Sequence, residues 1–84
     1  MNVNANRNRD TKLKAVQSKM ARAALGLGVR ELAELAKVSP DTIARLERGE
    51  VLRDRTVEDI RRALEAAGVE FTNGDQPGVR LRAK

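Results

Sequence analysis

The stretch from Val29 to Arg48 constrains the fold most, because it reads as two short helices joined by a tight turn. Ser39 is expected to cap the second helix, because its hydroxyl can accept from the free amides of the first turn. Pro40 follows at the first helical position, where a missing N–H costs nothing. Apolar residues recur at helical spacing with a phase shift across the turn, and they are Leu32, Leu35, Ala36, Val38, Ile43 and Leu46. Two such helices can bury their stripes against each other and leave the outer face of the second helix free.

Helical patterning continues on the N-terminal side of this pair. A helix is expected from Thr11, ended by Gly26 and Gly28. Its apolar face would carry Leu13, Val16, Met20, Ala24 and Leu27. The next two helices should cover about Val29–Ala36 and about Pro40–Arg48, with Gly49 directly after them.

A fourth helix is expected to open at Thr56, since Thr56-Val57-Glu58-Asp59 resembles a capping box. Gly68 would end it, and its buried stripe would be Val57, Ile60, Leu64 and Ala67. Past Gly68 the apolar period changes from helical to alternating. Because a dense turn signal, Asn73–Gly78, divides the alternating segments, Val69–Arg82 is predicted to form a β-hairpin.

These elements predict an all-α bundle of four to five helices containing a helix-turn-helix, with a short C-terminal β-hairpin. Residues 1–10 are expected to form a disordered, Asn-rich arm carrying Arg7 and Arg9. Residues 11–68 form the helical domain, and residues 69–84 the hairpin. A lone hairpin is marginal in water, so either the helical core or the hairpin of a second chain must cover its apolar face. An edge-to-edge homodimer would use Phe71, Val79 and Leu81.

The composition limits the classes of function that we expect for this chain. The 84 residues include 17 Lys+Arg and 12 Asp+Glu, giving a net charge of +5, which suits either a well-solvated surface or attraction to a polyanion. Histidine and cysteine are absent, and there is no Gly-rich phosphate loop or metal-ligand spacing, so neither an enzyme nor a metal or other cofactor is expected. No apolar run spans a membrane and Met1–Asp10 holds no signal peptide, so a cytoplasmic protein is expected.

The helix pair, the Leu46-Glu47-Arg48-Gly49 ending and the following helix resemble the Cro/cI family of helix-turn-helix regulators, also called XRE-like, over roughly residues 20–69. The resemblance implies a lambda-repressor-like fold and operator binding, usually as a dimer. It is typical of repressors on phages, plasmids and integrating elements. The tail Arg62–Phe71, followed by Gly78–Leu81, is similar to that of many short bacterial members.

The resemblance also implies roles for individual residues. The groove-facing side of the third helix would carry Ser39, Pro40, Asp41 and Arg45. Phosphate or backbone contacts would come from Ser39, Thr42, Arg48, Arg53 and Arg55. Arg22 and Glu47 correspond to a structural salt bridge between the first and third helices.

The sequence departs from the family pattern at three positions. Gly28 stands where a capping side chain is frequent, and Val29 where a phosphate-binding Gln is frequent. Arg30 is the expected replacement for that phosphate contact. Lys37 stands where Gly is frequent because the backbone tends towards positive φ, and a Lys there costs ~1 kcal/mol.

Arg45 is the expected base reader, because its guanidinium can make paired hydrogen bonds to guanine. Its alternative role is an i, i+4 salt bridge to Asp41. Asp41 can accept from cytosine, although favouring the helix N-terminus through the dipole is the preferred interpretation. Pro40 can touch a thymine methyl besides starting the helix. Thr42 can donate to phosphate or bond within its own helix.

Two functions remain open from the sequence. The first is a sequence-specific regulator that binds double-stranded DNA as a homodimer on an inverted repeat, with about 40–48 in the major groove. The second is a protein-interaction module, such as an antitoxin or a regulator controlled by a protein partner. No small-molecule ligand is evident, and no membrane partner is expected.

Overall fold

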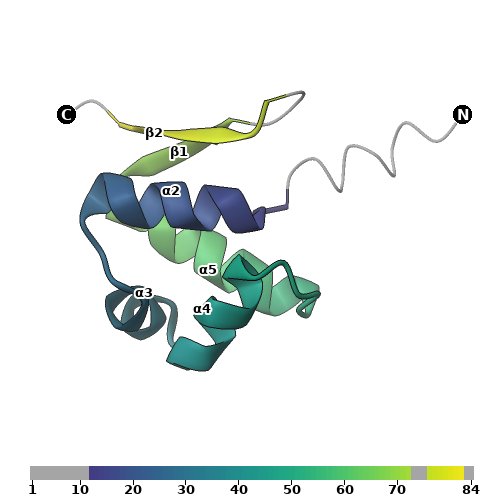
Figure 1. The fold of residues 1–84 in the computed structure, drawn as a ribbon. Helices are drawn as coiled ribbons and strands as arrows, with labels where there is room; N and C mark the ends of the chain where they lie inside the picture. The colour runs from purple at the N-terminus through teal and green to yellow at the C-terminus, as the bar shows by residue number, and fades with distance from the viewer. Residues whose placement is uncertain (1–11, 73–75, 83–84) are drawn as a thin grey trace, which may run out of the picture.

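The computed structural model of the chain describes residues 12–72 and 76–82. The predicted arm, Met1–Asp10, lies outside the described residues, as do residues 73–75 of the predicted turn. The elements, labelled as in Figure 1, are α2 (Ala15–Leu25), α3 (Val29–Ala36), α4 (Pro40–Glu47), α5 (Asp54–Ala67), β1 (Val69–Thr72) and β2 (Gly78–Leu81). The expected helical fold with a C-terminal hairpin is confirmed.

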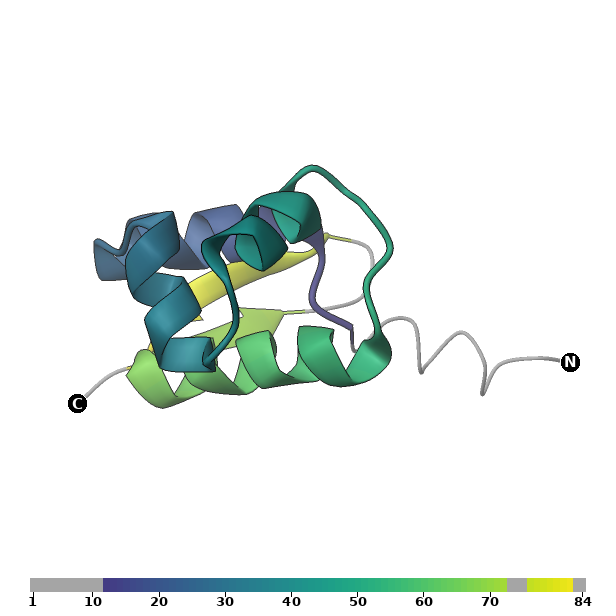
Figure 2. The same ribbon diagram turned by 90° about the horizontal axis from the view of Figure 1, so that it is seen from below.

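The helix α2 lies between the hairpin and the α3–α4 pair (Figure 1). Helix α5 packs against α3, and the view from below shows it running beside the hairpin (Figure 2). The shared core is aliphatic, and its most completely buried apolar residues are Ala21, Leu32, Ala33, Ile43, Ile60, Leu64 and Val69. The α3–α4 pair therefore presents its outer surface on the side of the molecule away from the hairpin.

The predicted apolar face of the first helix is wrong for Val16, Met20 and Ala24, whereas Leu13 and Leu27 contact the core from just outside α2. The helix begins at Ala15 rather than Thr11, and Val16 and Met20 are 49% and 38% exposed. The buried face instead contains Gln17, Ser18 and Ala21. Two polar residues can occupy this face because each has hydrogen-bond partners there, which removes the desolvation penalty of burial.

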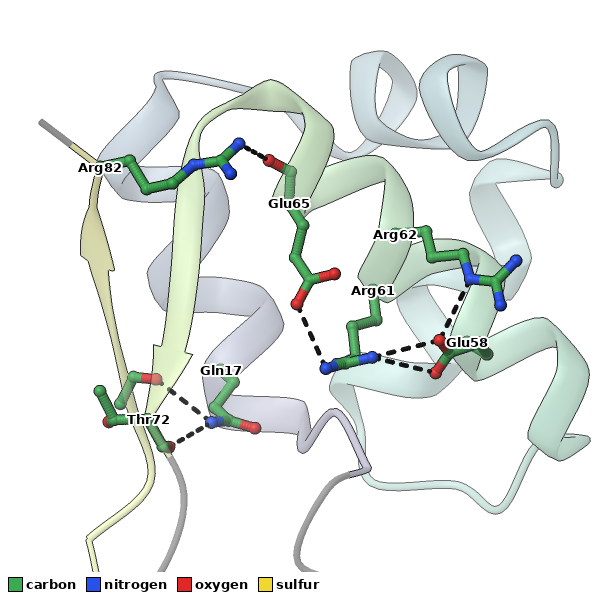
Figure 3. A network of polar contacts seen from close by, with 8 residues as sticks. Gln17, Glu58, Arg61, Arg62, Glu65, Thr72 and Arg82 are labelled. Atoms are coloured by element: carbon green, nitrogen blue, oxygen red, sulfur yellow. Dashed lines mark hydrogen bonds and ion pairs between the residues drawn. The ribbon is translucent and has the colours of Figure 1, made fainter. Parts of the chain in front are cut away.

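Gln17 joins α2 to both strands of the hairpin, and it is fully buried (Figure 3). Its side-chain nitrogen donates to the carbonyl oxygens of Thr72 at 3.0 Å and Gly78 at 3.2 Å. Its side-chain oxygen accepts from the backbone N–H of Lys14 at 3.0 Å. Thr72 and Gly78 are the last register pair of the antiparallel strands, so one side chain holds the end of the hairpin.

Helix ends follow the local sequence closely. Gly26 ends α2 with a φ of 71°, as expected, while Gly28 is the N-cap of α3 rather than part of the preceding stop. The backbone N–H of Gly28 donates to the Glu31 carboxylate at 2.6 Å, which gives this end one capping bond. Lys37 adopts a φ of 62°, so the expected positive φ at this turn is confirmed.

Helix α5 begins at Asp54, with Arg53 as its N-cap, so the predicted start at Thr56 is wrong. The chain reaches helical geometry two residues before the Thr56–Asp59 pattern, which leaves that pattern inside the helix. Val57, Ile60 and Leu64 are buried as predicted, whereas Ala67 is exposed. Gly68 ends the helix with a φ of 121°.

The hairpin packs its apolar face on the chain's own helices. Val69 is buried, Phe71 and Val79 are half-buried against the core, and Leu81 is 57% exposed. Arg82 anchors β2 to the end of α5, since its backbone N–H donates to Gly68 and its guanidinium to the Glu65 carbonyl (Figure 3). Of the two predicted covers for this face, the helical core is the one present in the single chain.

Candidate nucleic-acid interface

The helix α4 is fixed at its N-terminus by Ser39. The Ser39 hydroxyl accepts from the backbone N–H of Thr42 at 3.1 Å and lies 2.9 Å from the Thr42 hydroxyl. The buried face of α4 carries Ile43, Leu46 and Glu47. The opposite face of α4 therefore points outward, away from the core.

Three predicted site residues share that outward face, because Asp41, Arg45 and Arg48 follow at i, i+4 and i+7. Pro40 and Asp41 are exposed at the start of α4. The side chains of Arg45 and Arg48 are 44% and 57% exposed. A helix face of this kind is accessible to a large partner along its whole length.

Beside this face lies an open hollow between α4 and the start of α5. Its lining residues are Thr42, Arg45, Val51, Leu52, Arg53 and Thr56. The hollow thus brings together Thr42, Arg45 and Arg53, which sequence reasoning placed in the site separately. Val51, at its rim, is 94% exposed.

Other predicted site residues lie outside the hollow. Arg30 is exposed in the first turn of α3, and Arg55 in the first turn of α5. Neither forms a hydrogen bond or ion pair with other residues in the described part of the chain.

Glu50, which sequence reasoning did not single out, pairs with Arg45 of α4 and with Arg48, the C-cap residue of that helix. Its Oε1 accepts from Arg45 Nε at 2.9 Å, and its Oε2 from Arg48 Nη2 at 2.8 Å and Arg48 Nε at 3.1 Å. The alternative considered for Arg45, a salt bridge to Asp41, is not formed. The hydrogen bonds from Arg45 and Arg48 lower the pKa of Glu50 below its usual value, and Glu50 raises the pKa of Arg45.

The signal that could have revealed this pairing is Gly49. It adopts a φ of 89° and turns the chain back on α4. The backbone N–H of Gly49 donates to the Leu46 carbonyl, and that of Glu50 to the Arg45 carbonyl at 3.1 Å. These are the two bonds of a Schellman motif, which places the residue after the glycine against the residue five positions earlier.

The base of α4 is attached to α2 through a buried polar cluster. Arg22 Nη2 lies 2.7 Å from Glu47 Oε1, so the structure contains the ion pair that the resemblance implied. The Ser18 hydroxyl donates to Glu47 Oε2 at 2.6 Å. Burial favours a higher pKa for Glu47, but the hydrogen bonds from Arg22 and Ser18 outweigh it, and the pKa lies below its usual value.

The described residues contain no cluster of acidic, His or Cys side chains suited to a metal ion. Among the same residues, no helix is both long and apolar enough to span a membrane.

Comparison with protein families matches residues 17–72 to a family described as a helix-turn-helix domain. The match covers more than half of the chain and includes α3, α4 and the surrounding hollow. Among curated proteins, none matches this chain.

Proposed function

The chain belongs to the helix-turn-helix domain family, and we propose that it is a sequence-specific DNA-binding regulator of transcription. The observation that carries the proposal is the outward face of α4, where Arg45 lies beside an open hollow lined by a second arginine, Arg53. A net charge of +5 adds long-range attraction to a polyanion. The helix would enter the major groove with its N-terminal residues nearest the bases.

In this arrangement Arg45 reads guanine through its two acceptors, O6 and N7. Asp41 accepts from a neighbouring cytosine, or acts only through the helix dipole, and Pro40 touches a thymine methyl. Both residues are exposed in the first turn of α4, which supports this placement. These contacts would carry the sequence preference, because they are the ones that reach base edges.

Phosphate contacts would come from residues around the rim of α4. Ser39 and Thr42 offer hydroxyls at its start, and Arg30, Arg48, Arg53 and Arg55 offer cations. Such contacts fix the register of the protein on the duplex without reading sequence. The exposure of these arginines supports the assignment, since none has to leave a buried pair before it binds.

We further propose a homodimer on an inverted repeat, formed by edge-to-edge pairing of hairpins. The apolar face of the hairpin is occupied by its own helices, so a partner hairpin would add at a strand edge and cover Leu81. Because α4 lies on the side of α2 away from the hairpin, this pairing would keep both copies of α4 on one side of the joint sheet (Figure 1). Palindromic half-sites require that geometry.

Selection from a random duplex library at near-physiological salt tests the function. An enriched inverted repeat, with half-sites about one helical turn apart, is the expected result. Enrichment of a single half-site would reject the homodimer but not the sequence-specific binding of DNA. A monomer in sedimentation at high micromolar concentration would likewise reject only the homodimer. A folded protein that enriches no sequence would reject the proposal. Repression, the proposed direction of control, is tested with a reporter gene carrying the enriched site.

A second candidate function is binding of a protein partner over α4. The observation that favours it is Val51, an apolar side chain that is 94% exposed beside the hollow. A co-purified protein that protects α4 from hydrogen exchange, together with failure of the DNA selection, would put this function first.

A further inference from the structure

Arg45 of α4 and Arg48, the C-cap residue of that helix, are held differently by one carboxylate, that of Glu50. Arg45 uses only Nε to contact Glu50, at 2.9 Å. Arg48 uses both Nε and Nη2, and both meet the same oxygen, Oε2. Within the described residues, neither terminal nitrogen of Arg45 makes a hydrogen bond. Nη1 and Nη2 are therefore available together as a pair of donors.

A guanidinium has five N–H donors in a fixed planar arrangement. Recognition of guanine requires two of them, side by side, aimed at O6 and N7. Because Glu50 accepts from Arg45 at Nε alone, Nη1 and Nη2 of Arg45 point away from Glu50. Arg48 keeps one terminal nitrogen clear of Glu50, which suits a single contact to phosphate.

The position of Glu50 is set by the backbone rather than by the ion pair alone. The positive φ of Gly49 and the bond from the Glu50 N–H to the Arg45 carbonyl fix the two residues against each other. A Schellman motif frequently places an apolar contact at this pair of positions. In this chain an acidic and a basic side chain occupy them, so the turn that ends α4 also orients a side chain on its outer face.

We propose that Glu50 is a positioning residue for base recognition, which directs the terminal edge of the Arg45 guanidinium towards a guanine in the major groove. The inference rests on the proposed DNA-binding function. Glu50 itself touches no base. It determines specificity by restricting Arg45 to one presentation, and its negative charge at the same time weakens attraction to phosphate in general.

These two effects have opposite signs, and substitution separates them. Glu50→Ala removes both the hydrogen bond to Arg45 Nε and the negative charge. Affinity for unrelated duplex should rise, by about two- to fivefold, because one negative charge near the phosphates is lost. Discrimination at the base pair read by Arg45 should fall by about tenfold, within the range that a paired Arg–guanine contact supplies.

The experiment first identifies the enriched duplex with the unaltered chain and then finds the base pair at which Arg45→Ala loses preference. Binding to that duplex and to a duplex changed at that one pair is measured by fluorescence anisotropy. Glu50→Gln should keep most of the discrimination, because its amide oxygen can still accept from Arg45 Nε. Asp59→Asn, which removes one charge from an exposed position on α5, should leave the ratio of affinities unchanged.

The double variant Arg45→Ala with Glu50→Ala completes the test. If Glu50 acts through Arg45, the double variant shows the same ratio of affinities as Arg45→Ala alone. If the wild-type chain discriminates between the two duplexes and Glu50→Ala shows the same ratio of affinities, the positioning role of Glu50 is overturned. The proposed DNA-binding function would still stand. A wild-type chain that selects no duplex would overturn both.

Discussion

Arg22 and Glu47 join α2 to the base of α4 through a two-point contact. Arg22 Nη2 lies 2.7 Å from Oε1 and Arg22 Nε lies 2.9 Å from Oε2. The Glu47 side chain is only 8% exposed, so its charge is compensated by these bonds and by Ser18 rather than by water. Glu47 lies on the buried face of α4, so the pair joins α4 to α2 on the side opposite the outward face.

Glu47→Gln should destabilise the fold by about 2 kcal/mol, because Arg22 would lose a charged partner in a partly buried place. Urea unfolding followed by circular dichroism measures this, since the chain has no Trp or Tyr. The matched control is Glu70→Gln, at a solvent-exposed pair with Arg80, where the loss should stay under about 0.5 kcal/mol. Equal losses at both positions would contradict the structural role of Glu47.

The stabilisation from Glu47 should depend on pH in a defined direction. Its pKa in the folded chain lies below the ordinary value of 4.5, so the folded state binds its proton less readily than the unfolded state. The contribution is therefore fully present above that ordinary value and is lost as pH falls through the lower, folded-state value. Unfolding curves of wild type and Glu47→Gln should differ by a constant amount at neutral pH and converge in acid. If the difference in unfolding free energy between the two chains grows in acid, the predicted direction of the pH dependence is wrong.

Gln17→Met should loosen the hairpin, because it removes the donor for the Thr72 and Gly78 carbonyls while keeping a side chain of similar length. We expect a loss of about 1–3 kcal/mol. Hydrogen exchange should increase most in β1 and β2 and least in α4. Gln76→Met, at an exposed glutamine near the same strand, is the control and should change little. Unchanged strand protection in Gln17→Met would show that packing alone holds the hairpin.

Lys37→Gly should stabilise the chain, because Lys37 occupies the left-handed region with a φ of 62°. The relief of about 1 kcal/mol is partly offset by the greater freedom of glycine in the unfolded chain, so a rise of a few degrees in Tm is expected. Lys37→Ala also removes the charge but retains Cβ, and it should give no such rise. If alanine and glycine stabilise equally, the strain is not the cause.

Arg53→Ala should weaken DNA binding on all sequences alike. A phosphate contact carries no base information, and its loss reduces the slope of log affinity against log salt by about one unit. Titrations of the enriched and unrelated duplexes at several salt concentrations provide both slopes. Arg62→Ala, at a position paired with Glu58 on α5, should leave the slope unchanged. A change confined to one sequence would make Arg53 a base reader instead.

The elements that local chemistry defines could be predicted from the sequence. Ser39 and Pro40 set the start of α4, Gly68 sets the end of α5, and alternation after it predicted the hairpin. The positive φ of Lys37 was implied by the family resemblance, because Gly is frequent at this turn position. In each case the deciding residues lie within a few positions of the feature they control.

What could not be predicted depends on contacts between distant segments. The buried face of α2 was missed because Gln17 and Ser18 become acceptable in the core only through partners 55 and 29 residues away. The pairing of Arg45 was missed because helical spacing pointed to Asp41. Its partner, Glu50, lies beyond the helix end and reaches it only after the turn at Gly49.

The hold of Gln17 on Thr72 and Gly78 has a consequence for engineering. One buried amide bonds Thr72 and Gly78, the register pair next to the β1–β2 connection, so it holds together the two strand ends that this connection joins. Extra residues grafted into that connection would have their ends already brought together, at a modest closure cost. The far side of the molecule from α4 is thus a natural insertion point for a fluorescent label or an affinity peptide, leaving the arginine-bearing face untouched.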